Sequence, residues 1–183
     1  MYQKITNISD DGEFINEKIR EFKLWDEDKG LLWRSKNLNT KMFHDIKLSD
    51  FVTNKQEYAN IHLLSENIYK QTNAIMVRVS KTKVRFANIN DMSKIINLCE
   101  DSTKRFINKM IKHEIIAKRI DKIGGRSETK YLLNPIFFFS SKYLSPDLYF
   151  SFKHILSKYL TPWQVKLFEE YGNLKGEIII NKE

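Results

Sequence analysis

Two apolar-periodic segments separated by only a few residues limit the fold of this chain more than any other feature. The first, at 91–96, follows Asn90, a residue type that favours the N-cap position of a helix. Asn97 comes directly after it and can adopt the left-handed conformation that ends a helix. The second segment reaches residue 113 after a tight turn at 98–100 and carries its apolar side chains on one face. Two helices joined so closely predict a helix-turn-helix.

Two strand-like runs follow the second helix, at 115–121 and 129–133. The residues between them include the pair Gly124-Gly125, and glycine reaches positive φ at no steric cost, so the chain can reverse there. Helix, turn, helix and then a hairpin is the order of a winged helix-turn-helix. We therefore predict a recognition helix at 102–113 and a wing at 116–133.

The residues before this motif predict one helix and a small β-element. Thr53 and Gln56 have capping-box spacing, and apolar residues then recur at helical spacing up to about residue 71. β-Branched and aromatic residues at 76–79 and 84–87 flank a polar run, which predicts either a short hairpin or a single strand.

The two ends of the chain are predicted to add smaller elements. Residues 1–53 form an arm with a hairpin that turns at 26–30. After the wing, Ser145 and Thr161 each precede a proline, a pattern typical of a helix start. The second of these helices is expected to end at Gly172. The apolar faces predicted for the two helices consist of Leu148, Phe152, Ile155, Leu156 and Tyr159 in the first and Trp163, Leu167 and Phe168 in the second.

The expected fold is therefore α+β and mainly helical, with a winged helix-turn-helix core, an N-terminal arm and C-terminal helices. The predicted boundaries are 1–53 for the arm, 54–135 for the DNA-binding domain and 136–183 for the C-terminal helices and tail. The C-terminal helices either cover the core or form a dimer interface.

Positive charge is concentrated in the predicted helix-turn-helix and wing. The 183 residues include 31 Lys and Arg against 23 Asp and Glu, a formal net charge of +8. Between residues 102 and 130, nine side chains are basic and only three are acidic. Such an excess on a helix-turn-helix favours double-stranded DNA as the partner. The candidate DNA-binding residues are Ser102, Lys104, Arg105, Asn108, Lys109, Lys112, Lys118, Arg119, Lys122, Arg126 and Lys130.

The predicted recognition helix suits the chemistry of the major groove. Phe106 and Ile107 set its core face, so residues on the opposite side face outward. Arginine pairs bidentately with guanine and asparagine with adenine, which makes Arg105 and Asn108 the candidate base readers. The alternative is an ordinary solvated helix face and a soluble hairpin. Backbone or minor-groove contacts are expected from Lys104, Lys109 and Lys112 on the helix and from Arg119, Lys122 and Arg126 on the wing.

Other residue types provide no recognisable catalytic or metal-binding pattern. The histidines are too dispersed for a zinc spacing, and one cysteine cannot complete a structural zinc site. A phosphate-binding glycine loop and the His-x-His pair of nicking enzymes are both missing, so we expect neither an enzyme nor a cofactor. Cys99 is expected to be a small buried residue in the turn. Tyr131 and the run at 137–139 could stack on bases, but their position beside Pro135 favours core.

The same composition predicts a cytoplasmic protein with no membrane partner. A single cysteine cannot form an intramolecular disulfide, and the N-terminus lacks the apolar segment of a secretory signal. The longest apolar run, 136–139, is far shorter than the roughly 20 residues that cross a bilayer.

Three stretches, at 95–107, 115–119 and 129–135, resemble Firmicute plasmid replication proteins of the RepL-like winged-helix type, a pattern that phage proteins share. The most distinctive elements are Asn134-Pro135 and the helix that starts at Ser145. The resemblance implies a winged helix that binds repeated sites at a replication origin and recruits host replication proteins rather than cutting DNA. Glu114 departs from the pattern, because many winged helices end the recognition helix with glycine.

The sequence is compatible with three functions. The first is a plasmid or phage replication initiator, and the second is a transcriptional regulator that makes the same DNA contacts at promoters. The third is a protein-interaction module in which the winged helix is only a scaffold and the C-terminal aromatic residues bind a partner. For either DNA-binding function, the usual symmetry of such sites predicts a homodimer on DNA.

Overall fold

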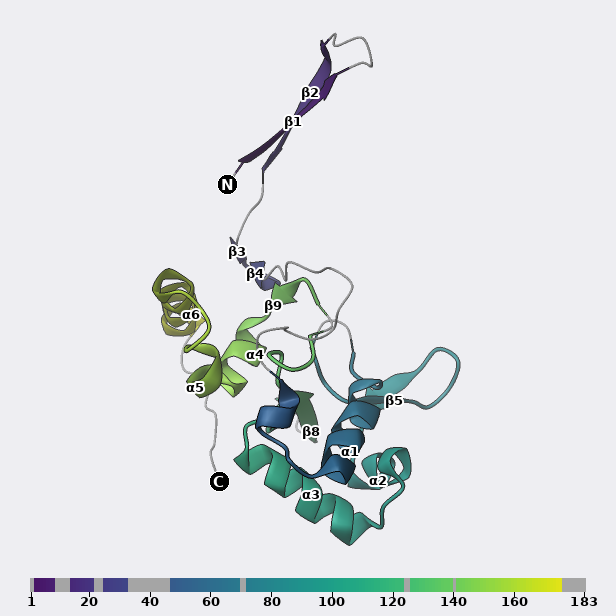
Figure 1. Ribbon diagram of the computed structural model, residues 1–183. Helices are drawn as coiled ribbons and strands as arrows, with labels where there is room; N and C mark the ends of the chain where they lie inside the picture. Colours follow the sequence, from purple (N-terminus) through teal and green to yellow (C-terminus); the bar gives the residue numbers. More distant parts are fainter. Residues whose placement is uncertain are drawn as a thin grey trace.

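The protein has a mixed α+β fold, seen in a computed structural model (Figure 1). Six α-helices and several small antiparallel sheets are present in the part of the chain that the structure describes. No helix in that part is long and apolar enough to cross a membrane. The described residues are 2–8, 14–21, 25–32, 47–69, 72–123, 126–139 and 141–175.

Helices α2 (Ile89–Ile96) and α3 (Glu100–Lys112) form the predicted close pair. The N-cap of α2 is Asn88 and not Asn90, because Asn88 forms a reciprocal capping box with Asp91. Asn97 ends α2 in the left-handed conformation at φ 53°, as predicted. Both helices therefore begin slightly earlier than their sequence patterns indicated.

Helix α1 (Lys55–Ser65) confirms the predicted first helix but differs at both ends. Its N-cap is Asn54 rather than Thr53, since the Asn54 side chain accepts hydrogen bonds from two backbone amides of the first turn. The helix also stops about six residues before the predicted end. Ile68 leaves it to form an antiparallel bridge with Ile75, so hydrogen bonds to a later segment replace those that would continue the helix.

The hairpin after α3 consists of β7 (Ile116–Ile123) and β8 (Arg126–Leu133). The two strands pair in continuous antiparallel register and extend beyond the predicted runs, while Gly124-Gly125 lies outside the described residues. The segment 73–75 adds a short third row of pairing beside β8. Ile75 N–H donates to Tyr131 O at 2.9 Å, and Leu133 N–H donates to Asn73 O at 3.0 Å.

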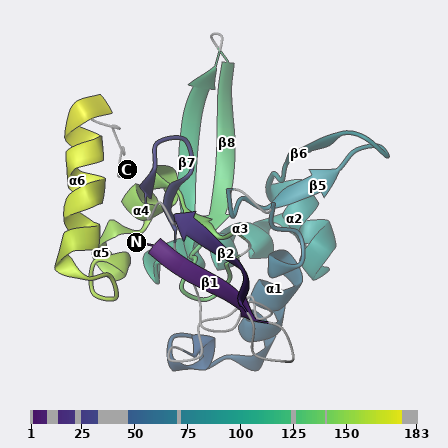
Figure 2. The ribbon, with the colours of Figure 1, turned by 90° about the horizontal axis from the view of Figure 1, so that it is seen from above.

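A second, smaller hairpin confirms one of the two predicted alternatives for the residues before α2. It pairs β5 (Met76–Arg78) with β6 (Val84–Phe86) in antiparallel register. The two hairpins β5–β6 and β7–β8 project from the same helical base in different directions (Figure 2).

The N-terminal region contains the predicted hairpin and one that the sequence did not reveal. The predicted one pairs β3 (Trp25–Asp26) with β4 (Gly30–Leu32), and β4 also pairs with β9 (Tyr143–Leu144). Gly30 has φ +88°, and a Cβ there would collide with the carbonyl oxygen of Leu144. The unforeseen hairpin, β1 (Tyr2–Ile8) with β2 (Phe14–Glu21), extends away from the rest of the molecule (Figure 1).

The predicted C-terminal helices are present with three corrections. The first is divided at Phe152 into α4 (Pro146–Ser151), which Ser145 caps as predicted, and α5 (Lys153–Leu156). Tyr159 and Trp163 are about half exposed instead of lying on the apolar faces. Gly172 does not end α6 (Pro162–Lys175), because its role is close packing: a Cβ there would lie 2.8 Å from Phe150 Cζ.

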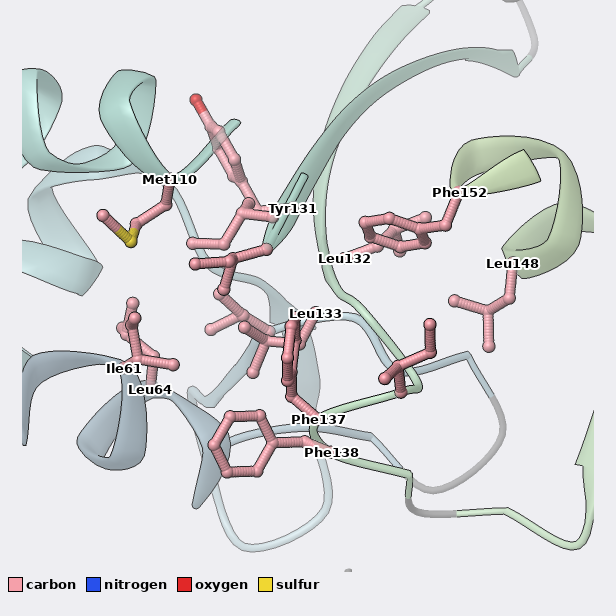
Figure 3. Packing of buried hydrophobic residues seen from close by; sticks show 14 of the residues in the cluster. Ile61, Leu64, Met110, Tyr131, Leu132, Leu133, Phe137, Phe138, Leu148 and Phe152 are labelled. Carbon is pink, nitrogen blue, oxygen red and sulfur yellow. The ribbon is translucent and has the colours of Figure 1, made fainter. Parts of the chain in front are cut away.

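One hydrophobic core contains residues from β3 through α6, and β8 runs through it (Figure 3). Tyr131 and Leu133 point toward α1 and α3, whereas Leu132 points toward Leu148 and Phe152 beyond the other face of the strand. Such alternation follows from the two-residue period of a strand. The prediction that Tyr131, Phe137 and Phe138 belong to the core is confirmed, and Phe139 packs against it while partly exposed.

Asn73 is expected to be one of the most sensitive positions of the fold. Its buried side chain donates to Leu133 O at 3.0 Å and to Phe138 O at 2.5 Å, and its φ of 55° suits asparagine or glycine. Asn73→Gly keeps this backbone conformation and removes only the side-chain bonds, so we expect a loss of about 2–3 kcal/mol of unfolding free energy. Asn73→Ala adds left-handed strain and should lose about 1 kcal/mol more. Urea denaturation measures both, and equal losses would contradict the strain argument.

Candidate nucleic-acid interface

The outer face of α3 presents a row of polar side chains. Arg105, Asn108 and Lys112 are exposed and follow one another at three- and four-residue spacing, which places them on one side of the helix. The opposite side is packed into the core through its buried residues Thr103, Phe106, Ile107 and Met110. This burial fixes the rotation of α3 and therefore the direction in which the row points.

Asp101 extends this row toward the start of α3, one turn before Arg105. An acidic residue in the first turn stabilises the helix by interacting with its dipole. It also changes the chemistry of the face, because a carboxylate repels phosphate but accepts a hydrogen bond from the N4 amino group of cytosine. Asp101 lies one residue before the segment 102–130 whose positive charge predicted DNA binding, so its place on this face was not predicted.

The remaining candidates on α3 have different surroundings. Lys104 is exposed, whereas Lys109 Nζ donates to both carboxylate oxygens of Glu57 on α1 at 2.7 and 2.8 Å. Ser102 is half-buried, and its hydroxyl lies 3.1 Å from the thiol sulfur of Cys99. Lys109 thus links two helices in addition to facing solvent.

Cys99 itself corrects the expectation of a buried packing residue. It is exposed at the N-cap position of α3, and this helix starts at Glu100, two residues before the predicted recognition helix. Hydrogen bonds from the Ser102 side chain and backbone lower the pKa of the Cys99 thiol.

The two faces of the hairpin β7–β8 carry different kinds of side chain. Ile116 and Tyr131 lie on the face that packs toward α3, and further along that face Lys118 and Ile120 become exposed. The other face carries Arg119, Lys130 and Asp121, all of them partly buried. The candidate residues Lys122 and Arg126 lie nearer the tip, and their side chains are outside the described part of the structure.

Ion pairs join the face that carries Arg119, Asp121 and Lys130 to α4. Arg119 contacts Asp121 at 2.6 Å and Asp147, in the first turn of α4, at 2.7 Å. Lys130 contacts the second oxygen of Asp121 at 2.6 Å and lies 4.5 Å from the ring centroid of Phe86. Burial raises the pKa of Asp121, but hydrogen bonds from Lys130 and Arg119 hold it below its usual value. Arg119 and Lys130 therefore hold the hairpin in position.

A further basic element lies outside the predicted DNA-binding residues. The hairpin β5–β6 carries exposed Arg78, Lys81 and Lys83, and its fourth basic residue, Arg85, pairs with Asp91. The feature that could have identified it is the presence of four basic residues and no acidic one within 76–86.

Comparison with protein-family models, with curated proteins and with solved structures finds no significant match for this chain. Among the described residues, no group of three or more His, Cys, Asp and Glu side chains is placed to hold a metal ion. The candidate site is the surface made by the outer face of α3 and by the face of β7–β8 that carries exposed Lys118.

The ion pairs of Asp121 should make stability depend on pH. A carboxyl with a lowered pKa in the folded state stabilises the fold above its unfolded pKa of about 3.9 and loses this contribution as pH falls through the folded value. We expect Asp121→Asn to be about 1–2 kcal/mol less stable than wild type at pH 7. The difference should shrink below about pH 4 in urea unfolding.

Asp50→Asn is the control for this prediction. Asp50 is exposed and has no ion-pair partner among the described residues, so its substitution should leave the unfolding free energy nearly unchanged at both pH values. A difference for Asp121→Asn that stays constant from neutral to acidic pH would contradict the ion-pair interpretation.

Proposed function

We propose that this protein is a sequence-specific double-stranded DNA-binding protein of the winged helix-turn-helix class. In this proposal α3 enters the major groove and β7–β8 acts as the wing. The observation that carries the proposal is the exposed row Arg105, Asn108 and Lys112 on a helix whose opposite face is fixed in the core.

The order and pairing of the elements support the class. Helix α1, the short strand segment 73–75, the pair α2 and α3, and the hairpin β7–β8 follow one another as in a winged helix. The segment 73–75 pairs with β8 on the side away from β7, which gives the small three-row sheet typical of that fold. The hairpin β5–β6 is an addition to this plan.

The chemistry of the exposed side chains supports the recognition step. Arg105 can pair bidentately with guanine and Asn108 with adenine, while Lys104 and Lys112 flank them and suit phosphates. On the wing, exposed Lys118 lies on the side that packs toward α3 and suits the backbone.

The ion-paired candidates receive a different role in this proposal. Lys109, Arg119 and Lys130 already contact carboxylates, so a phosphate would have to compete with those partners. We assign these three residues mainly to positioning α3 and the wing, and Lys122 and Arg126 to the backbone near the wing tip.

Within this class we favour a plasmid or phage replication initiator that binds origin repeats as a homodimer and recruits host replication proteins. The support is the resemblance of residues 95–107, 115–119 and 129–135 to plasmid replication proteins. A transcriptional regulator with the same contacts is the alternative. Exposed Tyr159 and Trp163, before and at the start of α6, provide apolar surface for a second copy.

The roles of Arg105 and Lys112 can be separated by binding measurements on a duplex selected from a random pool. Arg105→Ala should lose about 1–3 kcal/mol on the selected sequence and little on unrelated DNA, because it removes a base contact. Lys112→Ala should weaken all sequences alike and reduce the salt slope by about 1, because it removes a phosphate contact. Lys158→Ala, an exposed substitution after α5, is the control. Equal effects of the first two variants on both DNAs would contradict the assignment.

The initiator and the regulator differ in the DNA that they occupy. A mobility-shift assay over fragments tiling the protein's own gene and flanking DNA should shift a fragment that contains repeats and supports autonomous replication. A shifted promoter fragment without replication activity would favour the regulator, and no shift at any fragment would favour an interaction module. A mass in solution that stays monomeric at all concentrations would reject a dimer of the free protein.

A further inference from the structure

The hairpin β5–β6 is the most basic described element that the proposed interface leaves unused. Residues 76–86 include four basic side chains and no acidic one. Only Arg85 is paired with a carboxylate, whereas Arg78, Lys81 and Lys83 are exposed and have no acidic partner among the described residues. Three uncompensated cations thus gather at the free end of one small element.

The hairpin is held in a defined shape. Its turn is closed by Val79 N–H donating to Lys83 O at 2.9 Å and by Lys83 N–H donating to the Ser80 hydroxyl at 3.2 Å. At its base, both terminal nitrogens of Arg85 donate to Asp91 in the first turn of α2, at 2.5 and 2.8 Å. A structured projection loses less conformational entropy on binding than a flexible loop does.

One short helix, α2, lies between the hairpin β5–β6 and α3 in the chain. Strand β6 ends two residues before α2 begins, and α2 packs against α3. The hairpin and the wing leave this helical base in different directions (Figure 2). A straight duplex that holds α3 in its major groove continues past the helix on both sides, so a second DNA-binding element that leaves the base in another direction than the wing would contact other phosphates.

The tip also has an apolar component. Val79 and Val84, next to the cations, are 60% and 48% exposed. Apolar side chains flanked by basic ones suit the sugar edges and the minor groove of a duplex, where many DNA-binding proteins combine these two contacts. An acidic protein surface would also pair with these cations. The short connection from β6 to α2, which packs against α3, favours DNA, because α3 is the proposed recognition helix.

We propose that β5–β6 is a second backbone contact on double-stranded DNA, in which Arg78, Lys81 and Lys83 bind phosphates beside the segment read by α3. This inference rests on the proposed function. It lengthens the footprint on one side of the site and adds affinity without sequence preference, because phosphates are the same in every sequence.

The test compares Lys81→Ala/Lys83→Ala with a matched control, Lys142→Ala/Lys158→Ala, which removes the same charge from exposed lysines of the C-terminal part. Binding is measured by fluorescence anisotropy on arbitrary-sequence duplexes of about 12 and about 36 base pairs, roughly one and three helical turns. On the long duplex we expect the hairpin variant to bind about tenfold more weakly than the control, with a salt slope smaller by about 2. On the short duplex the two variants should bind alike.

Each other outcome overturns the proposal. If the hairpin variant matches the control on the long duplex, the hairpin does not contact DNA, and binding of a negatively charged polypeptide would point to an acidic protein instead. An equal loss on both duplexes would place the contact inside the α3 footprint. If wild type binds neither duplex, the proposed function itself fails, whereas wild-type binding that depends on Lys112 but not on Lys81 and Lys83 rejects only this inference.

A second measurement keeps the proposal testable if the double variant loses its fold. Iron-EDTA tethered to Lys81→Cys in a Cys99→Ser background, bound to the selected duplex, should cut the backbone outside the segment protected by α3. The same reagent at Lys158→Cys should give no localised cutting. Uniform or absent cutting from position 81, with wild-type affinity retained, would overturn the assignment.

Discussion

The pairing of residues 73–75 with β8 is the constraint on which the rest of this structure depends. This pairing places β8 between β7 and the chain that leads into β5–β6. The buried side chain of Asn73 adds hydrogen bonds to the carbonyl oxygens of Leu133 and Phe138. A buried carbonyl without a partner costs about 1–3 kcal/mol, so this amide stabilises the turn after β8 as well as the strand. Because alternate residues of β8 face the α1–α3 side and the α4 side, both helical groups depend on this one strand (Figure 3).

The basic residues divide into two groups by their partners. Lys109, Arg119 and Lys130 contact carboxylates of other elements and fix the orientation of α3 and the hairpin β7–β8. Arg105 and Lys112 face solvent on the outer side of α3. The proposed recognition therefore uses cations that the fold does not need, on elements that the paired cations help to position. A rigid scaffold of this kind reduces the entropy lost when two specific surfaces bind.

Local signals in the sequence predicted elements well where the responsible contact lies within a few residues. Asn97 ends α2, Ser145 caps α4, and both assignments hold because they depend on φ or on a hydrogen bond to the next turn. The choice of the capping residue was wrong at two helix starts, where several polar residues lie side by side. Asn54 caps α1 in place of Thr53, and Asn88 caps α2 in place of Asn90, because several residues nearby could have supplied an oxygen. The hairpin β1–β2 escaped notice because the apolar residues of its strands do not alternate regularly.

The sequence by itself determined the succession of helix, close helix pair and hairpin at 55–133, the core face of α3 and the concentration of positive charge, since these follow from periodicity, capping and composition. Only the tertiary structure decided which cations are already paired, since Glu57 and Lys109 are far apart in the chain, as are Arg119 and Asp147. It likewise decided that Gly172 packs against Phe150 inside a helix and that Cys99 is exposed. Contacts between distant segments depend on how whole elements pack, and no local pattern in the chain records that packing.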